Sequence, residues 1–182
     1  MTHGTLELII GPMFSGKTTR LIEIYNKYNR SSKKVVVINY VSDTRYHETM
    51  LSSHDRVTIP CVWADKLSTM LDKEEFKQAD VVLINEGQFF EDVYESVKYM
   101  VESMDKKVYI CGLDGDFQRN AFGSLLNLIP LCDNVTKLRS SCNSCNNDAI
   151  FSHRISDEKN LVVIGSSNYV PLCRMCYTNK NI

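Results

Sequence analysis

The amino-acid sequence predicts an α/β fold with a mainly parallel sheet, followed by a small C-terminal β-ribbon. At the N-terminus, an apolar run at residues 6–10 leads through a glycine-rich loop into a helical pattern at 18–30 and then a β-branched run at 34–40. This order is typical of a β-α-β unit, which joins parallel strands. Near residue 140 the pattern changes, because pairs of cysteines and short strand-like runs replace the alternation of strands and helices. We therefore expect one domain at 1–139 and another at 140–182.

Composition limits the classes of function. A chain of 182 residues, 43% of them apolar, can bury the core of one domain with a small appendage. Its 21 Lys and Arg residues nearly balance its 22 Asp and Glu residues, so no net positive field attracts nucleic acid. No apolar stretch approaches the length of a membrane span, and the first residues lack the pattern of a secretory signal. We expect a cytosolic or nuclear protein that binds neither membrane nor nucleic acid.

The glycine-rich loop carries the strongest signal. It matches the phosphate-binding pattern G-x-x-x-x-G-K-[ST] between a strand and a helix. Its glycines allow consecutive N–H groups to point at phosphates, and the following helix adds its positive dipole end. Lys17 supplies a charge for the outer phosphates, and the Thr18 hydroxyl can ligate Mg²⁺. The sequence therefore predicts a site for a nucleoside triphosphate, formed by Gly11, Pro12, Met13, Phe14, Ser15, Gly16, Lys17 and Thr18.

The remaining elements follow from hydrophobic periodicity. They continue the alternation of strands and helices up to about residue 138. We expect strands at 57–62, 79–86, 107–113 and 133–138, and helices at 63–77, 90–104 and 124–130.

Two polar residues end the expected strand at 79–86. In phosphate-loop proteins this is where an acidic side chain lies beside the magnesium ion. The first residue is Asn85, whose amide offers only a neutral oxygen. Glu86 follows directly and is well placed to take a proton from an attacking hydroxyl or water. We expect Asn85 to face the metal and Glu86 to act as the general base.

Polar loops follow other strands at the edge where ligands of open α/β sheets bind. One such loop carries charged residues and a histidine that are either substrate contacts or solvated: Asp43, Arg45, His54, Asp55 and Arg56. Phe117 and Phe122 lie in another, as either pocket walls or anchors on the domain. Arg119 either stabilises charge on a transferred phosphoryl group or is solvated.

Four of the seven cysteines form two C-x-x-C pairs, Cys142 with Cys145 and Cys173 with Cys176. In a reducing compartment this spacing indicates a structural zinc site, since four thiolates complete a tetrahedron and leave no open position. Between the pairs we expect ribbon strands at 150–154 and 160–165. Cys61, Cys111 and Cys132 lie in or near apolar runs and are expected in the core.

These motifs together resemble the thymidine kinases of the cytosolic and poxvirus type, and most of all the compact viral members. The similarity spans nearly the whole chain in order. Its motifs are residues 11–18, 43–46, 54–56, 86–90, 113–119 and the two cysteine pairs. The resemblance implies a RecA-like phosphate-loop core, a zinc-anchored lasso over the nucleoside, a homotetramer, feedback by dTTP and a cytoplasmic location, which is the host cytoplasm if the protein is viral.

The resemblance also implies residue roles. Glu86 accepts the proton of the 5′-hydroxyl of thymidine during phosphoryl transfer from ATP with Mg²⁺, and Asn85 belongs to the nucleotide and metal site. The lasso would read thymine through backbone groups. The implied substrate-binding residues are Met13, Asp43, Arg45, Phe89, Leu113, Phe117, Phe122, Leu161, Val162, Val163, Ile164, Gly165 and Tyr169.

Asn85 departs from the family pattern, which usually has aspartate there; we expect weaker metal binding, with Asp116 as a nearby source of negative charge. Two alternatives remain open from the residues alone. One is a RecA-like ATPase, which predicts a basic stripe and hydrolysis stimulated by DNA. The other is a zinc-ribbon module that binds nucleotide without turnover, which leaves Glu86 without a role.

Overall fold

A computed structural model describes residues 3–41, 50–158, 160 and 166–180 of the chain. The expected substrate contacts Asp43 and Arg45, the segment Leu161, Val162, Val163, Ile164 and Gly165, and the predicted strand at 160–165 thus lie wholly or almost wholly outside the described residues. Within the described part of the chain, no helix is long and apolar enough to cross a membrane.

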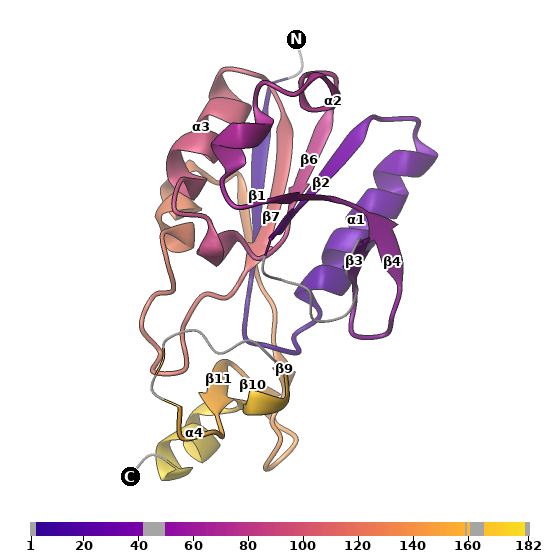
Figure 1. Cartoon of the computed structure of the whole chain (residues 1–182). Coiled ribbons are helices and arrows are strands. Elements are labelled where there is room, and N and C mark those ends of the chain that lie inside the picture. Colours follow the sequence, from indigo (N-terminus) through magenta and orange to yellow (C-terminus); the bar gives the residue numbers. More distant parts are fainter. Residues whose placement is uncertain (1–2, 42–49, 159, 161–165, 181–182) are drawn as a thin grey trace.

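The centre of the molecule is a six-stranded sheet in which every pair of neighbours is parallel. This confirms the α/β fold class with a mainly parallel sheet. Figure 1 shows its strands ending at the edge where the C-terminal elements lie. In order across the sheet the strands are β5 (Val62–Ala64), β2 (Val35–Tyr40), β6 (Val81–Ile84), β7 (Lys107–Gly112), β1 (Thr5–Ile10) and β8 (Asn134–Lys137).

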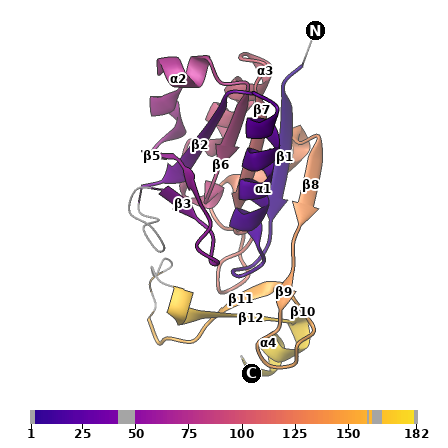
Figure 2. The same cartoon turned by 90° about the vertical axis from the view of Figure 1, so that its right-hand side faces the viewer.

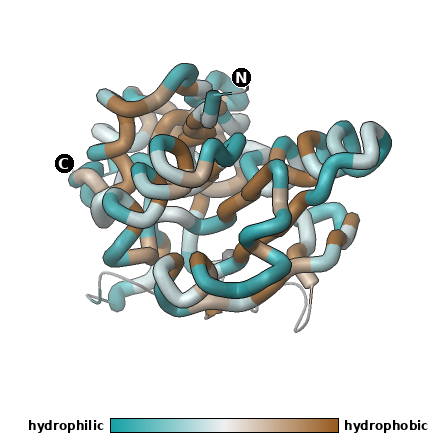
Figure 3. The backbone as a smooth tube through the Cα atoms, turned by 90° about the horizontal axis from the view of Figure 1, so that it is seen from above, coloured by the Kyte–Doolittle hydropathy of each residue, from teal (hydrophilic) through white to brown (hydrophobic). Residues whose placement is uncertain are grey.

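Helices cover both faces of the sheet (Figure 1). One face packs against α1 (Lys17–Arg30), and the other against α3 (Val93–Glu102) and the 3₁₀ helix η3 (Leu125–Leu131). Strand β6 is apolar along its whole length because both of its faces are buried. Val82 and Ile84 pack in the core with α3, whereas Val81 and Leu83 pack in the core with α1. Seen from above, the outer turns of the chain are mostly hydrophilic (Figure 3).

The C-terminal region forms small antiparallel sheets with a core of its own. Strand β9 (Ser140–Ser141) pairs with β10 (Asp148–Ala149), and β11 (Phe151–Arg154) pairs with β12 (Tyr169–Leu172). The 3₁₀ helix η4 (Ser166–Asn168) precedes β12, and α4 (Arg174–Lys180) follows it. Figures 1 and 2 both place this region beyond the carboxyl end of β1, next to the start of α1.

Residues 57–77 differ from the prediction. The expected strand at 57–62 is split into β4 (Thr58–Pro60), which pairs with β3 (Met50–Ser52) in a hairpin, and the sheet strand β5. The expected helix at 63–77 is wrong. Its chain forms the rest of β5, the 3₁₀ helix η1 (Leu67–Met70) and the one-turn helix α2 (Glu74–Lys77), even though Leu67, Met70 and Phe76 are fully buried. Spacing alone did not reveal that β5 would pair with β2 and interrupt the helical pattern.

The other differences are smaller. The expected helix at 124–130 is the 3₁₀ helix η3, and Gly87–Phe89 forms a further 3₁₀ turn, η2. Strand β12, helix α4 and the pair β9–β10 were not predicted, because they are short and depend on contacts within the C-terminal region. Cys111 is buried as expected, whereas Cys61 and Cys132 are half-buried at the edges of the two cores.

Asp92 stabilises the start of η1 from a distant position in the chain. Its carboxylate accepts hydrogen bonds from the N–H groups of Leu67 (3.1 Å) and Ser68 (2.8 Å) and from the Ser96 hydroxyl (3.2 Å). Burial alone would raise the pKa of Asp92, but the donors at Ser68, Leu67 and Ser96 outweigh it and hold this pKa below its ordinary value.

Replacing Asp92 by alanine should lower the free energy of unfolding by about 1–2 kcal/mol at pH 7. Because the folded-state pKa is lowered, this contribution is present above the unfolded-state pKa of about 3.9 and is lost as the pH falls through the folded-state value. Urea denaturation at several pH values measures the difference, with Glu91→Ala, an exposed neighbour, as the control. A difference that stays constant down to about pH 3 would contradict this account.

Candidate active site

The phosphate loop connects β1 to α1 with a backbone that glycine makes possible. Gly11 and Gly16 have positive φ angles, and a Cβ at Gly11 would lie 2.6 Å from the carbonyl oxygen of Leu138. Phe14 also has a positive φ of 62°, which is strained for a side chain of its size. The Lys17 ammonium turns back over the loop and donates to the Pro12 carbonyl at 2.7 Å. The loop thus has the conformation and the cation that a phosphate site requires.

Glu86 lies at the carboxyl end of β6 in a left-handed conformation, with φ 56° and ψ 42°. Its side chain is buried, and the Gln88 amide nitrogen donates to its Oε2 at 2.5 Å. Gln88 is held in turn by the Leu113 N–H, which donates to Gln88 Oε1 at 3.0 Å. A strained residue at a strand end, held by a chain of hydrogen bonds, is typical of functional positions.

Asn85 is buried at the end of β6, and its side chain lies beside Thr18 at the start of α1. Its Oδ1 lies 3.4 Å from the Thr18 hydroxyl, and its Nδ2 lies 2.8 Å from Oδ1 of Asn39. Asp116, the other acidic residue considered for this site, makes hydrogen bonds within its own loop. Its carboxylate accepts from the N–H groups of Gln118 (2.8 Å) and Asn120 (2.9 Å) and so holds its own turn together.

One cavity brings the phosphate loop and Glu86 together. His54 also faces it, with its ring against that of Phe14 at 6.1 Å between centroids. The lining residues are Met13, Phe14, Ser15, Gly16, Lys17, Thr18, Thr19, His54, Glu86 and Leu113. A phosphate held by the loop and an acceptor beside Glu86 would therefore lie next to each other in one cavity.

The predicted aromatic residues form two groups. Phe89 packs edge-to-face on Phe122 at 5.4 Å and is stacked on Tyr40 at 5.2 Å. Phe117 lies apart from these contacts, under the guanidinium of Arg154 at 3.8 Å. Arg154 also donates to the Tyr169 hydroxyl at 2.6 Å, so Phe117 and Tyr169 share one buried cation. The structure thus places Phe89 with Phe122, and Phe117 with Tyr169.

Arg119 packs on aromatic residues of the C-terminal region. Its guanidinium lies 4.6 Å from the ring centre of Tyr177, and the Tyr177 hydroxyl donates to the Phe117 carbonyl at 2.7 Å. Arg119 therefore helps to join the 114–123 loop to α4. This packing explains the position of its side chain, and no role at the phosphates is needed to explain it.

The C-terminal region touches the phosphate loop directly. The Met13 N–H donates to the hydroxyl of buried Ser152 at 3.0 Å, and the Ser140 hydroxyl donates to the Phe14 carbonyl at 3.0 Å. Two hydroxyls from β9 and β11 therefore hold the loop around its strained residue Phe14. Sequence reasoning missed Ser140, Ser152 and Arg154, since neither spacing nor residue type distinguishes them.

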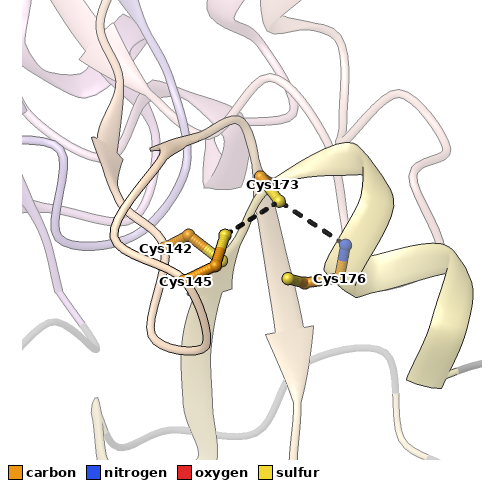
Figure 4. A group of neighbouring side chains, drawn as sticks. All are labelled: Cys142, Cys145, Cys173 and Cys176. Carbon is orange, nitrogen blue, oxygen red and sulfur yellow. Dashed lines mark hydrogen bonds between the residues drawn. The ribbon is translucent and has the colours of Figure 1, made fainter.

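The four paired cysteines converge, with their sulfur atoms all within 4.8 Å of one another (Figure 4). The sulfurs of Cys145 and Cys173 are 3.6 Å apart. Burial alone would raise the pKa of Cys142, but N–H groups of Cys173, Ser144 and Cys145 lower it to about 6. Thiolates in this arrangement suit a tetrahedral metal site, and the cluster is compatible with zinc.

Comparison with known proteins identifies the family. Residues 4–177 match the family model described as thymidine kinase. The chain is 40% identical over 180 residues to cytosolic thymidine kinase of Bos taurus, covering 98% of this chain and 74% of that protein.

Poxvirus proteins are similar over their full length. Thymidine kinase of Vaccinia virus (strain Ankara) is 42% identical over 181 residues, which is 99% of this chain and 100% of that protein. Thymidine kinase of Sheeppox virus (strain KS-1) is 40% identical over 178 residues, covering 97% of this chain and 98% of that protein. Neither the ATPase nor the binding-module alternative predicts such matches. The chain belongs to the thymidine kinase family.

Proposed function

We propose that this chain transfers the γ-phosphoryl group of ATP to the 5′-hydroxyl of thymidine, with Glu86 as the general base. The observation that carries the proposal is the shared cavity, in which the phosphate loop and the buried Glu86 face the same space. The 5′-oxygen attacks the γ-phosphorus, the bond to the β–γ bridging oxygen breaks, and ADP leaves. Glu86 takes the proton that the hydroxyl loses.

The residues around the phosphate loop fit a magnesium ion. Mg²⁺ prefers oxygen ligands, and the Thr18 hydroxyl and Asn85 Oδ1 lie 3.4 Å apart at the start of α1. When bound with ATP, the ion supplies positive charge that neutralises the phosphate oxygens. The N–H groups of the loop and Lys17 hold the triphosphate, while Glu86 holds the acceptor hydroxyl in line.

The acceptor pocket is proposed from the two aromatic groups. Phe89 and Phe122 offer an apolar wall, and Met13 and Leu113 line the cavity that Glu86 faces. Phe117 and Tyr169, both held by Arg154, would form another part of the pocket. A pocket that merely fits the thymine methyl group discriminates against deoxyuridine by about 1–3 kcal/mol, so deoxyuridine should be a weaker substrate.

The four cysteines are proposed to hold zinc in a structural site. Their donor set is closed, so the ion would fold the region at 140–182 and take no part in the reaction. The division at residue 139, a homotetramer, feedback by dTTP and a cytoplasmic location remain predictions, supported by the family resemblance.

Replacing Glu86 by glutamine should reduce kcat for thymidine about 10²- to 10⁴-fold, because the proton acceptor is lost. The Michaelis constant for ATP should change little, since the phosphate loop is untouched. The assay follows phosphorylation of labelled thymidine with Mg-ATP, with cytidine as the control nucleoside. A variant that keeps more than about a tenth of the wild-type kcat would rule out Glu86 as the base.

Metal analysis of the purified chain should find about one zinc ion per molecule. Cys173→Ser should lose this zinc and unfold at a lower temperature, because metal binding contributes to folding. Cys132→Ser, which changes a half-buried cysteine outside the cluster, is the matched control. Full zinc content in Cys173→Ser would count against the proposed ligand set.

The hydroxyls at Ser140 and Ser152 should support ATP binding. Each alanine variant removes one hydrogen bond to the phosphate loop, worth about 1 kcal/mol, so the Kd for ATP should rise about fivefold. Calorimetry measures this, and Ser141→Ala, an exposed neighbour on β9, should behave as wild type. Unchanged ATP affinity in both variants would show that these contacts do not hold the loop.

A further inference from the structure

A buried pair of amides lies where β2 and β6 reach the metal side of the active site. The two strands are parallel neighbours with Ile38 beside Ile84, so the next residues, Asn39 and Asn85, lie side by side. Each is only 1% exposed. Asn85 Nδ2 donates to Asn39 Oδ1 at 2.8 Å. A buried contact of this kind fixes the orientation of both side chains.

Each amide of the pair has a defined orientation, with a known atom facing its partner. The Tyr40 N–H also donates to Asn39 Oδ1, at 3.1 Å, so Asn39 presents its oxygen to Asn85. Asn85 must then turn its nitrogen toward Asn39 and its oxygen away from it. On that far side, Asn85 Oδ1 accepts from the Cys111 thiol at 3.1 Å and from the Thr18 hydroxyl at 3.4 Å. The amide oxygen of Asn85 therefore faces the start of α1.

This polarity matters because the two ends of an amide are chemically different. Its oxygen can ligate Mg²⁺ or accept from a metal-bound water, whereas its NH₂ group can only donate and would repel the ion. A carboxylate at the same position has two equivalent oxygens and needs no such orientation. An asparagine at position 85 is therefore useful to a metal only if a neighbour fixes which end faces it.

We propose that Asn39 is the positioning residue that turns the amide oxygen of Asn85 toward the nucleotide-bound metal. The inference rests on the proposed function, in which Asn85 belongs to the metal site. It adds that Asn39 acts through Asn85, without touching the metal or the substrate.

The test measures metal binding instead of turnover. Mn²⁺ replaces Mg²⁺, and its affinity for the protein–ADP complex is followed by electron paramagnetic resonance. Asn39→Leu removes the acceptor at similar volume, and Mn²⁺ affinity should fall about tenfold, as for other groups that orient metal ligands. Asn39→Asp keeps an oxygen acceptor for Asn85 Nδ2 and should bind Mn²⁺ at least as tightly as wild type.

The decisive measurement repeats Asn39→Leu in an Asn85→Asp background. Because both carboxylate oxygens are equivalent, loss of the orienting acceptor should then change Mn²⁺ affinity less than about twofold. If the tenfold loss persists with aspartate at position 85, Asn39 only maintains the local fold and the proposal is overturned. An unchanged Mn²⁺ affinity in Asn39→Leu alone would overturn it too.

Two controls separate the possible failures. Should Asn39→Leu fail to fold, as judged by its melting temperature, Asn39→Ala removes the same acceptor with less bulk and is read in the same way. Asn85→Leu should weaken Mn²⁺ binding; if it does not, Asn85 is not at the metal and the inference falls. Failure of the wild-type protein to phosphorylate thymidine would refute the proposed function itself and leave the metal measurements interpretable.

Discussion

The structure depends on holding a strained turn of backbone open at the end of β1. The phosphate loop needs positive φ angles at Gly11, Phe14 and Gly16, and its N–H groups must remain available for a ligand. Within the turn, the Ser15 hydroxyl and the Lys17 ammonium both donate to the Pro12 carbonyl. The turn is also supported from outside, by the parallel strands on either side of β1 and by the hydroxyls of Ser140 and Ser152. The C-terminal region is thus part of the scaffold of the phosphate loop.

The positions of Phe117 and Tyr169 also depend on contacts between the main domain and the C-terminal region. Phe117 belongs to the main domain and Tyr169 to the C-terminal ribbon, yet both contact the guanidinium of Arg154. A buried arginine that stacks on one ring and donates to the hydroxyl of another fixes their relative positions more tightly than apolar packing alone would. The four cysteines pack in the same small core as Phe151 and Leu172 of the ribbon that carries Arg154 and Tyr169. The proposed metal would therefore support both the contacts to the phosphate loop and the contact between Phe117 and Tyr169.

Features set by local chemistry could be predicted from the sequence. The loop conformation between β1 and α1, the place of Glu86 at the end of β6 and the convergence of the paired cysteines all follow from local residue patterns. Features set by contacts between distant segments could not. Residues 63–77 have helical periodicity, but pairing of β5 with β2 and the distant carboxylate of Asp92 decide their structure. Arg154 and Ser152 lie in an ordinary strand pattern, and only the fold brings them to Phe117 and Met13.

Asn85 and Asn39 illustrate that an amide beside a proposed metal site needs a second group to orient it. A buried carboxylate attracts a cation from any orientation, but its charge is costly to bury when the cation is absent. A buried amide avoids that cost, and it gains an oxygen of fixed direction only if a second group holds its nitrogen. In this chain the same strand register that builds the sheet supplies that group, because Asn39 follows Ile38 as Asn85 follows Ile84. The sheet register therefore determines which end of the Asn85 amide faces the start of α1, where the metal is proposed to bind.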